Sequence, residues 1–526
     1  DEAEARVEFA LAVDAFARHR NAGGGAARVP VAGIRGTTAL DIHTSALGLV
    51  LGDTVDPLRV MLAGERAYWL QSAQALDLPD AHPERLDQIV AAATLFATDD
   101  YGAADRTLAG LRTLSDAQLD TRDRYLTWVQ SLYPGHGALS PMRPDALADR
   151  HIAATIEANS HVLALADRVS DAQAIGAIIV MARAAAHHDG LRPHLMTMLR
   201  SDPGRLLALA TGCASALEHP QALLTAMSQA LDEADGAALD RIVAALPQRS
   251  VVLAAFATDA TGRAWALHRQ EQPEAPGTAQ IGIRYAVRLA YLGTDPARAL
   301  AIARDSVAVL ARLLDGEPNL CGEVAEAWAV LAIAASDAGE ADEALAAGDT
   351  AIDLYRRIES PSEEVRAGLG TALHNQSIRR GHTGDVEVAY RLAMEARAVI
   401  ADLAETRPAA YLSLLADALD NLAAQASRGG LKDTAIAIGT AVVALWRIMA
   451  ERRPDAYAGS LARSLSNHGV ALRHSGRPGD ASDVLDEAIE RFEVLVEQFP
   501  GRYEADLVIA RRNRSLIMNL AVRNTP

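Results

Sequence analysis

The stretch RPAAYLSLLADALDNLAAQASRGG (residues 407–430) returns 46 residues later as RPDAYAGSLARSLSNHGVALRHSG (residues 453–476). Both copies have the pattern of an apolar helix that begins after Arg-Pro and ends at a glycine. That glycine recurs every 45 or 46 residues, and an alanine follows five residues after each copy. The glycines are Gly339, Gly384, Gly430 and Gly476, and the alanines are Ala344, Ala389, Ala435 and Ala481. A fixed period of this length predicts a solenoid, in which each unit buries its apolar face only against its neighbours.

Working outward from this pair, we expect five helical hairpins followed by one last helix. The hairpins are predicted at 279–314, 317–360, 361–404, 407–450 and 453–498, and the last helix at 503–522. Small residues at the crossing points would let two long helices approach closely. A side chain larger than alanine at Ala435 or Ala481 should therefore overpack its hairpin, at a cost of about 1–3 kcal/mol.

Composition narrows the fold and the partners. The chain has 526 residues, half of them hydrophobic but only 4% aromatic, which favours an all-α protein of two or three domains. A net charge of −18 argues against binding to nucleic acid. The two cysteines, Cys213 and Cys321, are far apart in the sequence, and both lie in segments with a helical pattern. We therefore expect no disulfide, and we expect the protein to be cytoplasmic. No run of 18 apolar residues and no signal-peptide pattern occurs, so no membrane association is expected.

The pattern of helices and breaks divides the chain into four parts. We predict a helical segment at 1–52, a helical, winged-helix-like arm at 53–158, degenerate helical repeats at 159–278 and the solenoid at 279–526. The proline-rich stretch QEQPEAPGT (residues 270–278) is either a linker or an ordinary loop between helices. The sequence begins at Asp1, directly in a helical pattern, and we expect it to be part of a longer polypeptide.

No motif for catalysis or metal binding stands out. A phosphate-binding loop needs glycines followed by a lysine and a hydroxyl residue, but Gly23–Gly25 precede alanines, and the only lysine, Lys432, lies in a repeat turn. Adjacent His187 and His188 point about 100° apart on a helix, so a helix C-terminal cap suits them better than a shared metal. We therefore predict no enzyme activity, no catalytic residues, no metal site and no cofactor for this chain.

The repeat unit resembles a tetratricopeptide repeat. That family has a small residue in the first helix, a glycine-like turn, an alanine five positions later and a second small residue seven positions after it. Gly469, Gly476, Ala481 and Ala488 meet all four requirements, and Ala423, Gly430, Ala435 and Val442 come close. The unit at 361–404 departs from the pattern, with Ser377 and Arg380 where small or aromatic residues are usual.

In similar tetratricopeptide arrays the first helices line a concave groove, where asparagines can bind the backbone of an extended peptide. Four asparagines recur in phase with the repeat: Asn375, Asn421, Asn467 and Asn513. Arg379 and Gln425, each four residues after one of these, would share the same helix face. We predict these six residues as a partner-binding groove, with the alternative that the asparagines bond neighbouring repeats and join the stack.

A second resemblance covers the first part of the chain. LAGERAYWLQSA (residues 62–73) and YLTWVQSLYPGHGALSPMRPDALADRHI (residues 125–152) are similar to the region that follows the nucleotide-binding core in actinobacterial STAND-type NTPases, relatives of the NACHT and NB-ARC switches. The resemblance implies a core upstream of Asp1 that holds ATP or ADP with Mg²⁺. It also implies that residues 1–20 are the tail of that core.

Two functions remain open at this point. In the first, the chain is the sensor and autoinhibitory half of such a signalling NTPase, with a role in antiphage defence, and a protein or peptide ligand in the groove triggers homo-oligomerisation. In the second, the chain is a constitutive scaffold that holds a partner protein without switching.

Overall fold

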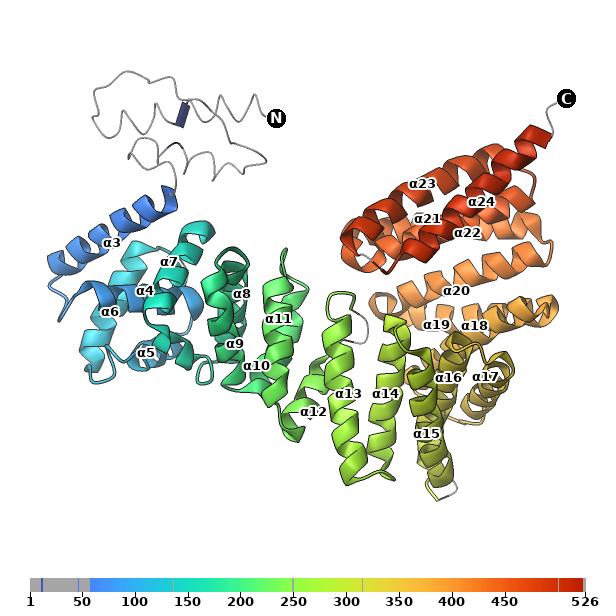
Figure 1. Ribbon diagram of the computed structural model, residues 1–526, viewed down its shortest axis with the longest axis horizontal. Helices are drawn as coiled ribbons and strands as arrows, with labels where there is room; N and C mark the ends of the chain where they lie inside the picture. The colour runs from blue at the N-terminus through green and yellow to red at the C-terminus, as the bar shows by residue number, and fades with distance from the viewer. Residues whose placement is uncertain are drawn as a thin grey trace. The chain divides into compact units, whose positions relative to one another are not determined.

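The structure is a computed structural model, and its helices are labelled as in Figure 1. It describes residues 57–135, 137–247, 250–314, 316–499 and 501–523, together with residues 11–12 and 46. Two compact units divide between Ala260 and Thr261, within α13 (Ala254–Glu271). Apart from residues 11–12 and 46, the helical segment predicted at 1–52, which includes Gly23–Gly25, lies outside the described residues. The boundaries between the four parts of the chain, at residues 53, 159 and 279, remain predictions.

The first unit consists of short helices joined by tight turns. They are α3 (Pro57–Ala75), α4 (Pro83–Leu95), α5 (Tyr101–Ala109), α6 (Leu119–Leu132), α7 (Asp145–Ala158), η1 (Ser160–Leu165), α8 (Asp171–His187), η2 (Asp189–Leu191), α9 (Arg192–Arg200), α10 (Pro203–Ala214), α11 (Gln221–Ala230), η3 (Leu231–Glu233) and α12 (Gly236–Ala245). Trp69 and Trp128 are fully buried anchors of its N-terminal part, whereas the neighbouring Tyr68 is exposed. The Trp128 Nε1–H donates to Ser72 Oγ at 2.9 Å, which satisfies the one polar atom of this ring.

The described residues contain no strand, and the all-α prediction is confirmed. In the predicted winged-helix-like arm, the only β-type pairing among these residues is an isolated antiparallel bridge between Thr98 and Leu139. The winged-helix detail therefore stays a prediction. The stretch predicted as a linker or loop at 270–278 holds the end of α13, a turn at residues 272–275 and the start of the next helix.

The second unit is a stack of helical hairpins in the predicted order, with bounds within four residues of the predicted ones. The first helices are α14 (Pro276–Leu292), α16 (Cys321–Asp337), α18 (Glu363–Thr383), α20 (Pro408–Arg428) and α22 (Pro454–His474). The second helices are α15 (Pro296–Leu314), α17 (Ala341–Arg356), α19 (Val386–Thr406), α21 (Lys432–Arg452) and α23 (Pro478–Gln498), and α24 (Glu504–Arg523) ends the stack. A 3₁₀ turn, η4 (Pro318–Leu320), precedes α16. The prediction of an α-solenoid of tetratricopeptide-like hairpins is confirmed.

The four turn glycines explain why the period is visible in the sequence. Each has a positive φ, between 76° and 91°, in the left-handed region that side chains disfavour. The residue after each glycine donates its N–H to the carbonyl five residues earlier, as in Glu340 to Ala335 at 2.8 Å and Leu431 to Ala426 at 2.9 Å. This hydrogen bond closes a Schellman motif, which ends the first helix and turns the chain into the second.

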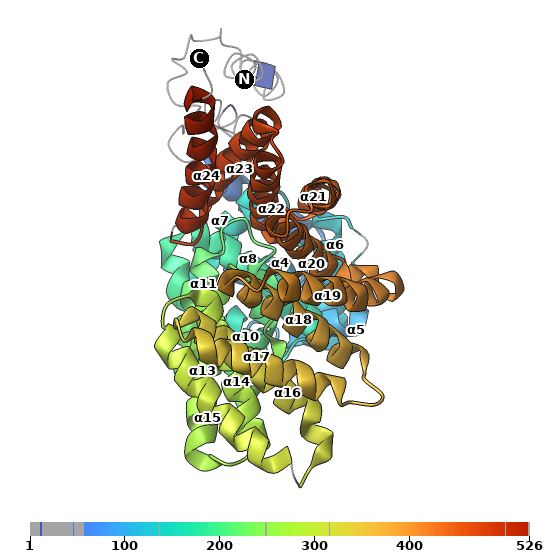
Figure 2. The same ribbon diagram turned by 90° about the vertical axis from the view of Figure 1, so that its right-hand side faces the viewer.

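Packing in the second unit distinguishes an inner and an outer layer. Successive first helices contact one another, and each second helix packs between the first helix of its own hairpin and that of the next. Figure 2 shows α21, α22, α23 and α24 side by side at the C-terminal end. The first helices therefore form the inner layer. The alanines that follow the turns are at most 1% exposed, which confirms the predicted close crossings.

One helix of the described chain, α21, is long and apolar enough by length and composition to cross a membrane. In the stack its Val442, Val443 and Trp446 are buried in a cluster with Leu461 of α22. These residues are therefore part of the solenoid core.

The first hairpin and the loop before α24 also meet. The Arg502 guanidinium donates to Tyr291 Oη at 2.6 Å and lies over the Tyr291 ring at 4.6 Å from its centre. These two residues are 211 positions apart in the sequence. One arginine therefore connects both ends of the solenoid.

Candidate binding surface of the second unit

Asn421 joins two hairpins of the stack. It is 7% exposed, and its amide nitrogen donates to Ser377 Oγ at 3.1 Å and to the His374 carbonyl at 3.3 Å, both on α18. Its amide oxygen accepts from Gln425 Nε2 at 2.9 Å, and Gln425 is itself buried. Among the six residues predicted as a groove, Asn421 and Gln425 therefore lie between repeats and do not face solvent.

The other three asparagines have different surroundings, although they occupy the same place in the repeat. Asn467 is exposed, and Asn375 and Asn513 are half-buried. The residue in register with Ser377 one repeat later is Ala423, which has no hydroxyl group to accept from Asn467. Periodicity alone therefore did not decide the role of these positions, because each role depends on a partner in the preceding hairpin.

Ser377 and Arg380, the departures from the repeat pattern, are part of a polar junction. Ser377 Oγ donates to the Ala389 carbonyl at 2.7 Å, in addition to accepting from Asn421. Arg380 and Gln376 both donate to the Asp349 carboxylate of α17, at 2.6 and 2.7 Å. Hydrogen bonds thus replace the usual small residues between these hairpins.

Arg379, the remaining predicted residue, belongs to a group of charges on the inner layer. We call Arg284 and Arg288 of α14, Glu326 and Asp337 of α16, and Arg379 of α18 the charged inner surface. Desolvation lowers the pKa of Arg379 to about 10, against the opposing effect of Asp337 and Asp349. Desolvation also lowers the pKa of Arg288, and the nearby Arg284 guanidinium adds to this shift.

The carboxylates of this surface combine exposure with desolvation. Glu326 and Asp337 are exposed to solvent, yet surrounding protein raises the pKa of both by desolvation, against nearby Arg284 and Arg379 respectively. Neither carboxylate forms a hydrogen bond or ion pair with the described part of the chain, and the same is true of Arg284. Ionised groups that protein surrounds but does not pair can bind the opposite charges of a partner. The i, i+4 spacing of Arg284 and Arg288 was the available sequence signal for this surface.

A half-buried carboxylate lies on α20, two hairpins beyond α16. Asp420 of α20 accepts hydrogen bonds from Ser464 Oγ of α22 at 2.6 Å and from Trp446 Nε1 of α21 at 2.7 Å. Desolvation raises its pKa from 3.8 to about 7, although both hydrogen bonds oppose the shift. No sequence motif identified Asp420, because its partners come from two other helices.

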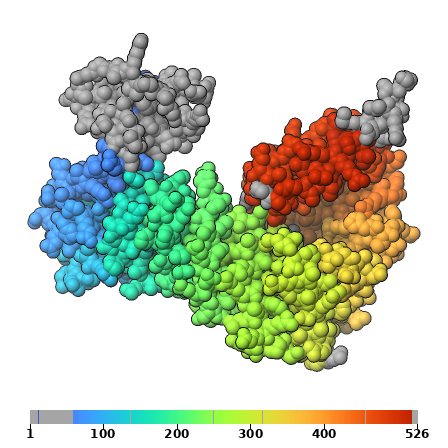
Figure 3. Space-filling model, in the orientation of Figure 1, coloured from blue at the N-terminus to red at the C-terminus, as the bar shows by residue number. Residues whose placement is uncertain are grey.

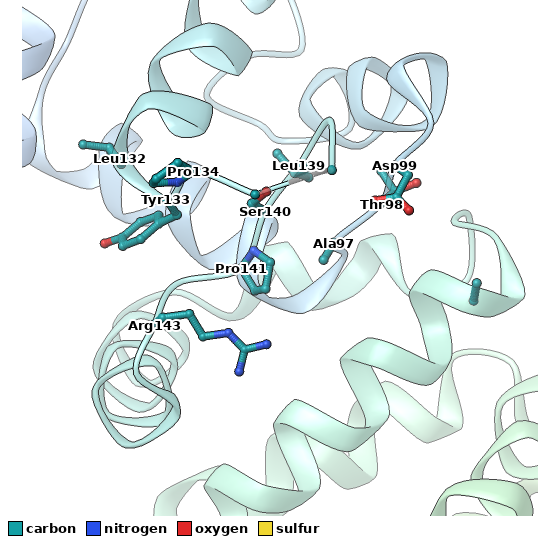
Figure 4. Close-up of a pocket in the computed structure, with 13 residues that line it drawn as sticks. Ala97, Thr98, Asp99, Leu132, Tyr133, Pro134, Leu139, Ser140, Pro141 and Arg143 are labelled. Carbon is teal, nitrogen blue, oxygen red and sulfur yellow. The ribbon is translucent and has the colours of Figure 1, made fainter. Parts of the chain in front are cut away.

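The first unit contains a separate cavity of about 620 Å³ (Figure 4). It lies between residues 97–99 and the turn at 132–143, which pair through the Thr98–Leu139 bridge. Its charged lining residues are Asp99 and Arg143, and the Arg143 guanidinium pairs with Asp145. Most of the remaining lining is apolar or glycine, so the charged inner surface is the stronger candidate for recognition.

Metal binding has no candidate within the described residues, where no three histidine, cysteine or acidic side chains come together. His187 and His188 stand at the C-terminal end of α8, where His187 is the last helical residue. The His187 ring meets that of His219 edge-on, with 6.4 Å between ring centres.

No protein-family profile and no curated protein sequence matches the chain. Among solved structures it is similar to YrrB, described as a TPR protein with an unusual peptide-binding site, at 17% identity and a TM-score of 0.27, over 48% of this chain and 98% of that one. It is also similar to a Rap protein complexed with competence and sporulation factor, at 13% identity and a TM-score of 0.36, over 69% and 99%. The APC/C hetero-tetramer Cut9-Hcn1 matches at 12% identity and a TM-score of 0.31, over 91% of both chains. Likenesses at this level say nothing about the partners of this chain.

Proposed function

We propose that the chain is a protein-interaction module, and that its second unit binds a protein or peptide segment on the charged inner surface. The observation that carries the proposal is the state of Arg284, Glu326 and Asp337. All three are charged groups on inner-layer helices that lack a direct partner in the described chain. A bound segment with complementary charges would supply the missing interactions, and its backbone groups could bond the exposed polar side chains nearby.

The order of charges favours a partner that crosses the helices. Arginines come from α14, carboxylates from α16 and an arginine from α18, and these first helices are neighbours in the stack. A segment laid across them meets positive, negative and positive groups in turn. Such an alternation selects against a partner of uniform charge, because like charges in contact are unfavourable.

A random peptide library selected on the full chain tests this proposal. The double variant Glu326→Gln, Asp337→Asn removes two charges without changing side-chain size. Peptides selected on the wild type should bind this variant at least about tenfold more weakly by fluorescence polarisation, equivalent to about 1.4 kcal/mol.

A matched control uses the outer layer of the same unit. Glu387→Gln, Glu405→Gln removes the same charge from exposed positions on α19. Its affinity for the selected peptides should stay within about twofold of the wild type. An equal loss in both double variants would reject the inner surface as the binding site.

A finer form of the proposal rests on the sequence resemblance. It makes the chain the sensor and autoinhibitory half of a STAND-type signalling NTPase, with ATP or ADP and Mg²⁺ held by a core outside this chain. A ligand would then have to favour the open state by about 5.5 kcal/mol to move it from 1:99 to 99:1. Ligand binding that leaves nucleotide exchange in the full-length protein unchanged would reject the switch and favour the constitutive scaffold.

A further inference from the structure

The last described helix of the second unit, α24, has an apolar face that the described chain leaves open. Val508, Ile509 and Leu516 of α24 are 64%, 54% and 39% exposed. Together with exposed Arg512 and Ser515 they recur at i, i+1, i+4, i+7 and i+8, which places them on one side of the helix. We call these five residues the α24 face.

The repeat shows what this side of a first helix normally contacts. In the preceding first helices the position of Val508 is held by Gly370, Ala416 and Ala462, all buried. A Cβ atom at Gly370 would lie 2.6 Å from Ile400 of α19, so the second helix of the hairpin approaches very closely there. A valine at this position would overpack such a contact. The α24 face is therefore suited to an occupant that packs differently from a regular second helix.

A second, complementary surface lies on the neighbouring helix. Asp483, Glu490, Val494 and Glu497 of α23 are exposed and recur at i, i+7, i+11 and i+14, again on one side of the helix. We call these residues the α23 stripe, which is acidic around one exposed valine. By contrast, the α24 face carries the exposed Arg512, whereas Arg511 and Arg514 of α24 already pair with Glu493 and Asp486 of α23.

Both surfaces belong to the same end of the second unit. Arg511 of α24 pairs with Glu493 of α23 at 2.7 Å. The exposed Val494 is the next residue after Glu493, and Val508 lies one helical turn before Arg511. Figure 3 shows α23 and α24 in red as a continuous surface at the C-terminal end of this unit.

We propose that this end is a homodimer interface, in which the α24 face of each copy packs on the α23 stripe of the other. A two-fold axis repeats each contact, so one chain supplies both the basic apolar face and its acidic counterpart. Arg512 stands in the middle of the α24 face and Glu490 in the middle of the α23 stripe. These two residues are therefore expected to meet across the axis.

Sedimentation equilibrium of the full chain tests this inference. The wild type should sediment as a dimer of the 55.7 kDa chain, and Ile509→Asp should weaken dimerisation at least about tenfold. Ile448→Asp is the matched control, because Ile448 is 53% exposed and stands one repeat before Val494 on α21, away from the end of the stack. It should leave the dimer intact.

A charge exchange tests the pairing of the two surfaces. Arg512→Glu and Glu490→Arg should each weaken the dimer, and the two combined in one chain should restore most of the lost affinity. A monomeric wild type, an equal effect of Ile448→Asp or a double variant weaker than either single one would overturn the inference. Capture of a different protein by the α24 face of a monomeric chain would overturn it as well.

Discussion

Replacing Asp420 by asparagine should make the stability of the C-terminal hairpins less dependent on pH. Asp420 lies in a desolvated site between three helices, without a lysine or arginine partner among the described residues. The amide of asparagine has nearly the same shape and no charge. Its oxygen can accept from Trp446, and its nitrogen can donate to Ser464 Oγ, so both contacts survive the substitution.

The sign of the effect follows from the raised pKa. In the unfolded chain this carboxyl ionises near its ordinary value of 3.8, but in the folded chain it ionises near pH 7. Below pH 3.8 both states are protonated and the folded state loses nothing. Between these values the unfolded state gives up its proton first, so the stability contributed by Asp420 falls as the pH rises. Above pH 7 the full cost applies, roughly 4 kcal/mol for about three pKa units at 1.36 kcal/mol each.

Hydrogen exchange measured by mass spectrometry on the full chain is the appropriate assay. Two units need not unfold together, so a single unfolding free energy is not defined, whereas exchange reports local opening. After correction for intrinsic rates, Asp420→Asn should slow exchange in α20 and α22 at pH 8, and the difference should shrink towards pH 4. Glu405→Gln, on the exposed side of α19, should change neither. Faster exchange in Asp420→Asn at pH 8, or a difference independent of pH, would refute the reasoning.

Three further substitutions test the packing of the second unit by the same exchange assay. Asn421→Ala should destabilise the junction of α18 with α20 by about 1–3 kcal/mol, because buried partners lose their hydrogen bonds. As a control, Asn467→Ala removes an exposed side chain from α22 and should change local stability by less than about 0.5 kcal/mol. Ala481→Leu, at a fully buried crossing, should cost about 1–3 kcal/mol and speed exchange in α22 and α23. Arg502→Ala should remove about 0.5–1 kcal/mol of contact with Tyr291 and speed exchange only at the C-terminal end of α14 and the start of α24.

The hairpins of the second unit could be predicted from the sequence because their signals are local. A left-handed glycine ends each first helix wherever it occurs, and a buried alanine follows at a fixed distance. The predicted bounds agree with the helices to within four residues, as in 407–450 against Pro408–Arg452 for α20 and α21. Each of these features depends on only a few neighbouring residues of the chain.

The candidate surface could be predicted only in part, because its chemistry depends on neighbouring helices. Asn421 and Asn467 are in the same register, but Ser377 gives Asn421 an acceptor, and Ala423 gives Asn467 none. Arg379 was selected for its position four residues after Asn375, and it does lie among inner charges. The carboxylates near Arg379 are Asp337 of α16 and Asp349 of α17, and no local spacing relates these helices to α18.

The polar junctions also distinguish repeats that would otherwise be interchangeable. The apolar and small positions of successive hairpins are so alike that a hairpin stacked one repeat out of place would still bury alanine against leucine. Such a stack would separate Asp420 from Ser464 and leave this half-buried, desolvated carboxylate with one donor fewer. It would also separate Asn421 from Ser377. At the other described junctions, the residue equivalent to Ser377 has no hydroxyl group that could accept the hydrogen bond from Asn421. Each unpaired buried group costs about 1–3 kcal/mol, and more when charged, which is comparable to the whole gain from one well-packed side chain. Hydrogen bonds that fit at one junction only therefore penalise the wrong order of hairpins. The Asp420 junction is also sensitive to pH, because desolvation raises the pKa of this carboxyl to about 7.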